Sequence, residues 1–85
     1  MARVEDVVRD FIVINFLFGE TDRKLSDDDS LLELGIIDST GILELVFFLE
    51  ATYAIQIREQ EMVPANLDSI SKVANFISRK LAAAR

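Results

Sequence analysis

The sequence predicts an all-α fold built around three long helices. Apolar residues recur at helical spacing in three segments, at about residues 3–17, 39–54 and 70–83. The stretches between them contain the single proline and clusters of aspartate and serine, which are typical of turns and helix caps. With 85 residues and a hydrophobic content of 51%, the chain is predicted to fold as one domain, residues 1–85, around a modest core.

The first helix is expected to run from about Arg3 to Leu17. Its apolar face is broader than a surface helix needs, which assigns these side chains to the core. They are Val4, Val7, Val8, Phe11, Ile12, Ile14 and Phe16. Gly19 is suited to ending the helix, because glycine readily adopts the left-handed conformation that follows a helix.

Residues 20–37 are predicted to form a long loop that is rich in acidic residues. Six apolar residues are numerous enough to attach this loop to the core: Leu25, Leu31, Leu32, Leu34, Ile36 and Ile37. The loop also contains an Asp-Ser-Leu sequence at residues 29–31. Because barely one turn separates it from Gly35, Ser30 is interpreted as a local cap or turn residue.

The second helix is expected from about Ser39 to Ala54. Asp38 is a preferred cap, since its carboxylate can accept hydrogen bonds from the free amides of the first turn. Ser39 falls at the positive end of the helix dipole, a position that stabilises a phosphate ester. One stripe of this helix is assigned to the core: Ile42, Leu45, Val46, Leu49 and Tyr53.

The second helix is followed by a loop, residues 55–67, and a last helix at about residues 70–83. Pro64 favours a turn or a helix start within the loop. The pair Asp68 and Ser69 is interpreted as the cap of the last helix. Its apolar stripe is Ile70, Val73, Ala74, Ile77 and Leu81. Its polar face contains Lys72, Arg79 and Lys80, and the last two suit the negative end of the helix.

The composition disfavours catalysis by this chain. The sequence has no cysteine and no histidine, which removes disulfides, thiolate nucleophiles, cysteine–histidine metal sites and a histidine base. It also has no Walker loop and no G-x-G-x-x-G sequence. No apolar run approaches the roughly 20 residues that a transmembrane helix needs. We therefore expect a cytoplasmic protein that is not an enzyme, inserts into no membrane and binds no metal.

The charge distribution favours protein partners over nucleic acids. The net charge is −6, and no basic residue lies between Lys24 and Arg58. That interval holds seven acids: Asp27, Asp28, Asp29, Glu33, Asp38, Glu44 and Glu50. Such a surface repels phosphate backbones and attracts partners that have basic docking patches.

The residues around Ser39 resemble a known family. Asp38-Ser39 at the start of a Leu/Val-rich helix, preceded by the sequence SLLELG at residues 30–35, resembles the acyl carrier proteins and the related peptidyl and D-alanyl carriers. The resemblance extends over nearly the whole chain. It implies an acyl-carrier-like bundle of three long helices plus one short helix, the short one near residues 64–68. The sequence VPANLDSI at residues 63–70 is similar to that of stand-alone carriers of specialised pathways.

In that family the serine after the aspartate carries 4'-phosphopantetheine as a phosphodiester. The resemblance therefore implies that Ser39 is the attachment site, with Asp38 as the helix cap beside it. The prosthetic group comes from coenzyme A through a phosphopantetheinyl transferase, and its thiol carries acyl groups as thioesters. The family most often has leucine after the serine, whereas this chain has Thr40 and then Gly41, which bears on its choice of partner enzymes.

The second helix also has residues outside its core stripe. Adjacent Phe47 and Phe48 cannot both point inward, because neighbours on a helix are separated by about 100°. The pattern of the family assigns Phe47 to the surface. The predicted partner-docking residues are Thr40, Leu43, Glu44, Phe47 and Glu50. The resemblance also implies a pocket for the acyl chain between helices, at Ile42, Val46 and Ile70, which the periodicity itself assigns to packing.

The expected partners are the transferase, an acyl- or aminoacyl-activating ligase and the enzymes that take the acyl group, and the expected state is a monomer. Two alternatives remain open on the sequence. One is an aminoacyl or peptidyl carrier for a stand-alone adenylating ligase. The other is an acidic helical adaptor that is never modified, for which replacing Ser39 by alanine would be silent.

Overall fold

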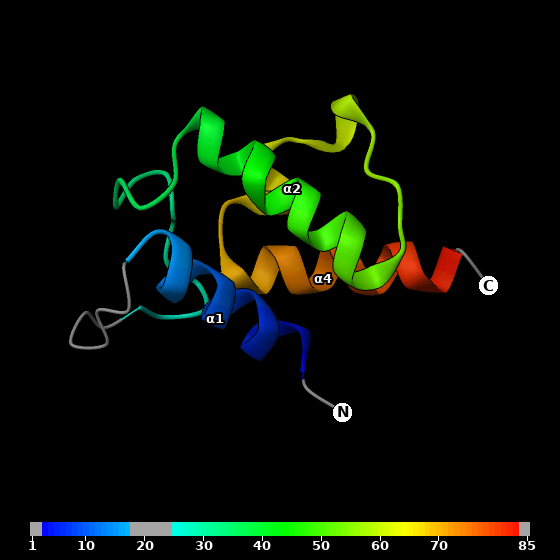
Figure 1. Cartoon of the computed structure of the whole chain (residues 1–85), viewed down its shortest axis with the longest axis horizontal. Helices are drawn as coiled ribbons and strands as arrows, with labels where there is room; N and C mark the ends of the chain where they lie inside the picture. The colour runs from blue at the N-terminus through cyan, green and yellow to red at the C-terminus, as the bar shows by residue number, and fades with distance from the viewer. Residues whose placement is uncertain (1–2, 18–24, 84–85) are drawn as a thin grey trace.

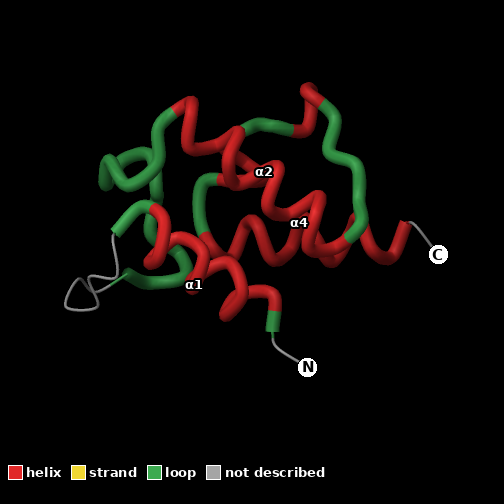
Figure 2. The backbone as a smooth tube through the Cα atoms, in the orientation of Figure 1, coloured by secondary structure: helices red, strands yellow, loops and turns green. Residues whose placement is uncertain are grey.

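The computed structural model describes residues 3–17 and 25–83, which form helices and loops without a strand (Figures 1 and 2). The elements are α1 (Val4–Asn15), α2 (Ser39–Tyr53), the 3-10 turn η1 (Glu59–Glu61), α3 (Pro64–Leu67) and α4 (Ile70–Ala83). The predicted all-α fold of three long helices and one short helix is confirmed.

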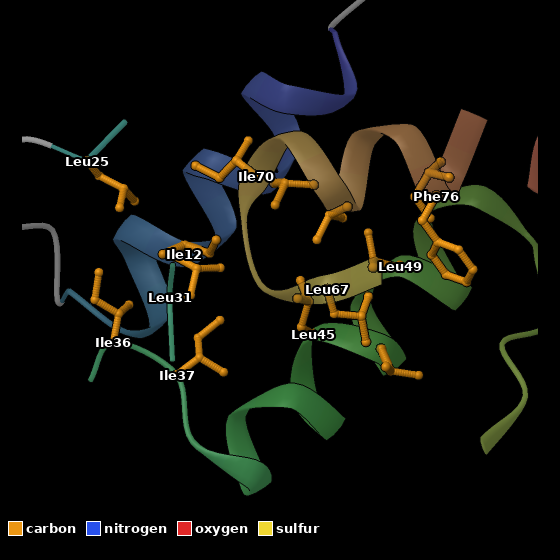
Figure 3. Close-up of a cluster of buried hydrophobic side chains, with 14 of the residues drawn as sticks. Ile12, Leu25, Leu31, Ile36, Ile37, Leu45, Leu49, Leu67, Ile70 and Phe76 are labelled. Atoms are coloured by element: carbon orange, nitrogen blue, oxygen red, sulfur yellow. The ribbon is translucent and has the colours of Figure 1, made fainter. Parts of the chain in front are cut away.

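The long helices enclose one hydrophobic core. Helices α1 and α3 both pack against α4, and α2 crosses over α4 in Figure 1. Figure 3 shows that every helix and the loop before α2 contribute side chains to this core. The labelled residues are Ile12, Leu25, Leu31, Ile36, Ile37, Leu45, Leu49, Leu67, Ile70 and Phe76.

Helix α1 is shorter than expected, and one of its residues was assigned wrongly. It ends at Asn15, where the turn widens: the Ile12 carbonyl accepts the Phe16 amide at 2.9 Å and also the Leu17 amide, five residues on, at 3.2 Å. Ile14, predicted to be in the core, is 67% exposed because the apolar face is wider than the arc that the other helices cover. The predicted helix end at Gly19 lies outside the described residues.

The loop before α2 is attached to the core by four of its six predicted apolar residues. Leu32 and Leu34 are exceptions, with exposed fractions of 38% and 42%. The turn is closed by hydrogen bonds from Leu34 to the Ser30 carbonyl and from Gly35 to the Leu32 carbonyl. Residues in so tight a turn cannot all face inward, so these two leucines lie at the surface.

Helix α2 ends at a residue that is unusual for its position. The cap residue Ala54 has φ 54° and ψ 45°, which is the left-handed conformation that glycine adopts most readily. For an L-residue this conformation costs roughly 1–2 kcal/mol. Helix α4, in contrast, begins with a well-matched cap, because the Ser69 hydroxyl accepts a hydrogen bond from the Lys72 amide at 3.1 Å.

We therefore expect Ala54→Gly to stabilise the protein. Relief of the left-handed strain outweighs the extra chain entropy of glycine, with a net gain of about 0.5–1 kcal/mol. Chemical denaturation measures this gain. The matched control is Ala51→Gly within the same helix, where glycine should lower stability by about 1 kcal/mol. Equal destabilisation by both substitutions would contradict the strained cap at Ala54.

Candidate functional site

The start of α2 presents Ser39 at the surface. Asp38 has an extended backbone and caps the helix, its Oδ1 accepting a hydrogen bond from the Gly41 amide at 2.8 Å. The predicted capping role of Asp38 is thereby confirmed. Ser39 is the first residue of the helix and is exposed. Neither its amide nor that of Thr40 donates a hydrogen bond to another described residue, so two amides at the positive helix end remain available to an anion.

The loop before the helix fixes the position of Ser39. The amides of Ile36 and Ile37 both donate to the Leu31 carbonyl, at 3.0 and 3.2 Å. All three of these side chains are buried, and Gly35 makes the bend before them at φ +69°. Glycine suits this position because of its backbone conformation, since no atom lies within 4 Å of an added Cβ.

Gly41, two residues after Ser39, lets α1 approach α2 closely. A Cβ atom at this position would lie 2.8 Å from the Phe16 ring and 3.2 Å from the Ile37 side chain. The Phe16 ring is held in turn, because it packs edge-on against Phe11, which stacks on Phe48 with 4.2 Å between ring centroids. The unusual glycine after Ser39-Thr40 therefore serves the packing of α1 on α2.

Replacing Gly41 by alanine should lower the free energy of unfolding by roughly 1 kcal/mol. Overpacking costs about 1–3 kcal/mol, and the better helix propensity of alanine offsets about 1 kcal/mol of it. Thermal denaturation compares this variant with Thr40→Ala, a neighbouring exposed position. A net gain in stability from Gly41→Ala would mean that the aromatic ring moves aside at no cost.

The serine of the other Asp-Ser pair in this half of the chain has a structural role. The Ser30 hydroxyl donates to Asp68 Oδ2 at 2.6 Å and accepts a hydrogen bond from the Glu33 amide at 3.1 Å. Asp68 also accepts the Leu32 amide at 3.0 Å, which ties this loop to the turn before α4. The interpretation of Ser30 as a turn residue is confirmed. Ser69 rather than Asp68 caps α4.

An open, mainly apolar cavity of about 480 Å³ adjoins Ser39. It is lined by Leu32, Ser39, Ile42, Leu43, Glu59, Met62, Val63, Pro64 and Leu67. Of the three residues predicted to form an acyl pocket, only Ile42 lines this cavity. Val46 and Ile70 are 1% and 0% exposed within the core, because they lie on the side of their helices that faces the other helices. The residues missed are Leu32, from the loop before α2, and those of the segment 59–67, where the apolar sequence Met-Val-Pro was the only signal.

The segment that forms one wall of the cavity is anchored at Glu61. Its carboxylate accepts the Arg58 amide at 2.9 Å and pairs with Lys80 on α4 at 3.0 Å. Both contacts hold the pKa of Glu61 below its ordinary value, and the backbone hydrogen bond from Arg58 has a larger effect than Lys80. Their contribution to stability is thus complete at neutral pH and is lost as the pH falls through that lowered pKa.

Four of the five predicted docking residues form one exposed surface on α2. This exposed surface, called the docking surface after that prediction, consists of Thr40, Leu43, Glu44 and Phe47; Leu43 is 46% exposed and Phe47 is 66% exposed. Glu50 differs, because it is half-buried and its carboxylate accepts the Ile57 amide at 2.9 Å. Its geometry supports the loop after α2 rather than a partner contact.

Neither a metal site nor a membrane-spanning helix is found among the residues that the structure describes. In residues 3–17 and 25–83, no group of three or more His, Cys, Asp or Glu side chains is placed to hold a metal ion. Within the same ranges, no helix has the length and apolar character needed to span a membrane.

Comparison with known proteins places the chain beside acyl carrier proteins. No protein-family model matches the chain. The chain is 34% identical over 76 residues to "Probable acyl carrier protein PigG" of Serratia sp. (strain ATCC 39006), covering 89% of this chain and 86% of the relative. Its fold is similar to the crystal structure of an acyl carrier protein from Thermotoga maritima, with a TM-score of 0.69. That likeness covers 98% of this chain and 95% of the other at 19% identity, so it bears on the fold alone.

Proposed function

Because the chain belongs to the acyl carrier protein family, we propose that it carries acyl groups on a 4'-phosphopantetheine arm attached to Ser39. Members of the family are carriers and not enzymes, and they act together with partner enzymes. The chain is accordingly a carrier. The attachment residue, the prosthetic group and the identity of the partners are the proposal.

The exposure of Ser39 at the capped start of α2 is the observation that carries the assignment. Its hydroxyl is accessible, whereas Ser30 is engaged on both sides by Asp68 and Glu33. Ser69 is 3% exposed and caps α4. Among the described serines that follow an aspartate, only Ser39 is exposed and has a hydroxyl that makes no hydrogen bond to another described residue.

The surroundings of Ser39 fit a phosphodiester and a long flexible arm. The two available amides and the positive helix end favour an anion next to the Ser39 side chain. The apolar cavity beside it offers Ile42 and Leu43 from α2 and Met62 from the opposite wall as contacts for the arm. When bound, the prosthetic group supplies a terminal thiol on which acyl groups are held as thioesters. The protein's own residues position its attachment point and present it to partners.

Loading from an acyl-coenzyme A tests this function. A broad-specificity phosphopantetheinyl transferase should add the acylated arm to the purified protein, seen as one discrete increase in intact mass. Neutral hydroxylamine should then remove the acyl group and leave the arm in place, because a thioester is cleaved and a phosphodiester is not. No increase in the mass of the folded protein would favour the unmodified adaptor.

We propose that the docking surface is where partner enzymes bind. Large apolar side chains rarely cluster on a protein surface without a binding role. Here Leu43 and Phe47 lie with Glu44 on the helix that begins at the attachment point. The acidic charge in this half of the chain favours the approach of basic partner surfaces.

Phe47→Ala should weaken turnover by partner enzymes by roughly tenfold or more, as expected for an aromatic residue central to an interface. The melting temperature should change little, since the side chain is 66% exposed. Turnover is measured as the rate of loading by the transferase at a series of protein concentrations. The melting temperature is measured by thermal denaturation. Ala51→Ser, at an exposed position of the same helix, is the matched control. A large loss of stability in Phe47→Ala would place the ring in the core and reject the docking surface.

A further inference from the structure

Glu59 introduces a charge into the otherwise apolar cavity beside Ser39. Among the described residues that line this cavity, it is the one with an ionisable side chain. The remaining lining residues apart from Ser39 are aliphatic, methionine or proline. A carboxylate in such surroundings discriminates among ligands by their charge, because the apolar walls contribute similarly to any group of the same shape.

The Glu59 carboxylate is available to a ligand. Its side chain forms no hydrogen bond or ion pair with any residue in the described part of the chain, whereas Glu61 in the same turn is engaged by Arg58 and Lys80. Glu50 is likewise engaged, by the Ile57 amide. The two neighbouring acids thus maintain the fold, and Glu59 does not.

The position of Glu59 is fixed even though its side chain has no partner among the described residues. Its carbonyl accepts the Met62 amide at 3.0 Å, which closes the 3-10 turn. The Glu61 carbonyl accepts the Asn66 side chain at 2.9 Å, and Asn66 is bonded in turn by Arg79 of α4 at 3.1 Å. The turn that presents Glu59 is therefore attached to α3 and α4, which fixes the backbone position from which this exposed side chain lines the cavity.

We propose that this cavity selects acyl groups that bear a protonated amine, such as aminoacyl groups, with Glu59 as the residue that recognises the ammonium. The inference rests on the proposed attachment of the arm at Ser39. An ammonium gains an ion pair with Glu59, a neutral acyl group gains none, and an acyl group ending in a carboxylate is repelled.

Three thioesters of similar size and different charge provide the test. β-Alanyl-, butyryl- and succinyl-coenzyme A are loaded separately by the same transferase. Exchange of each acyl group onto a small free thiol is then timed, and each rate is divided by that of the corresponding free S-acyl pantetheine. This ratio cancels the intrinsic reactivity of the thioester and reports how far the cavity protects it. Backbone amide chemical shifts of residues 59–63 provide a second readout that does not depend on exchange.

The β-alanyl group should be protected roughly two- to fivefold more than the butyryl group, the range of a partly exposed ion pair. Succinyl should be the least protected. Glu59→Gln should remove the advantage of β-alanyl, and the amide shifts that distinguish it from butyryl should disappear. Glu33→Gln, an exposed acid of the loop before α2 that neither lines the cavity nor belongs to the docking surface, should retain the advantage.

Two results overturn the inference in different ways. Equal protection of β-alanyl and butyryl in the wild type, or an advantage that survives in Glu59→Gln, rejects the cargo preference and leaves the carrier function intact. Failure of all three thioesters to load on the folded protein rejects the carrier function itself, and the cargo preference falls with it.

Discussion

Ser39→Ala is expected to abolish loading of the prosthetic group completely while the protein remains folded. The hydroxyl oxygen is the proposed point of covalent attachment, so no residual loading is expected through a neighbouring group. Ser39 is exposed, and the helix cap is supplied by Asp38, so removal of the hydroxyl should change the melting temperature little. Intact mass after incubation with coenzyme A and transferase measures the first effect, and circular dichroism measures the second.

Ser30→Ala is the matched control, because Ser30 also follows an aspartate. It should load as the wild type does but be less stable, since its hydroxyl links Asp68 to the Glu33 amide. Ser39→Ala should therefore lose loading and keep its stability, whereas Ser30→Ala should keep loading and lose stability. Normal loading of Ser39→Ala would exclude Ser39 as the attachment site.

Leu45→Ala should lower the stability of the protein more than any of the other substitutions. Leu45 lies on the buried side of α2, is 0% exposed and belongs to the central cluster in Figure 3. Truncation of a buried leucine to alanine costs about 2–5 kcal/mol, since apolar contacts are lost and a cavity remains. A domain of this size has only about 5–15 kcal/mol in total, so a large share of its stability is removed.

Urea denaturation of Leu45→Ala beside Phe47→Ala gives the sharpest comparison. The two residues are two positions apart on α2, and one is fully buried while the other is 66% exposed. Leu45→Ala should shift the urea midpoint strongly, and Phe47→Ala should barely shift it. Similar shifts for both would contradict the division of α2 into a core side and a docking surface.

Much of the fold follows from local sequence signals that tertiary structure does not override. Helical periodicity, the cap at Asp38 and the proline at the start of α3 each placed an element close to its observed bounds. The errors arise where a pattern is compatible with more than one environment. Ile14 and Leu34 are apolar residues in apolar stretches, and only the packing of the remaining chain decides that they are exposed.

The candidate site also has some features that local sequence determines and others that depend on packing between distant segments. The cap and the exposure of Ser39 depend on a few adjacent residues, so the sequence was sufficient to predict them. The cavity depends on segments far apart in the chain, since Leu32 and Ile42 meet Met62 across it. Core and cavity residues share the same apolar character, and so Val46 and Ile70 were predicted to line a pocket from which they are absent. Neither the engagement of Glu50 nor the availability of Glu59 could be read from residue type alone.

Peptide mapping of the loaded wild-type protein tests the central claim most directly. Trypsin leaves residues 25–58 as one peptide, because no lysine or arginine lies between Lys24 and Arg58. Cleavage after glutamate instead separates Ser30 from Ser39, since Glu33 lies between them, and releases residues 34–44. We expect this peptide to carry the phosphopantetheinyl group and fragmentation to place the group on Ser39. The group on any other peptide, or its absence from a folded protein treated with an active transferase, would exclude Ser39 as the attachment site.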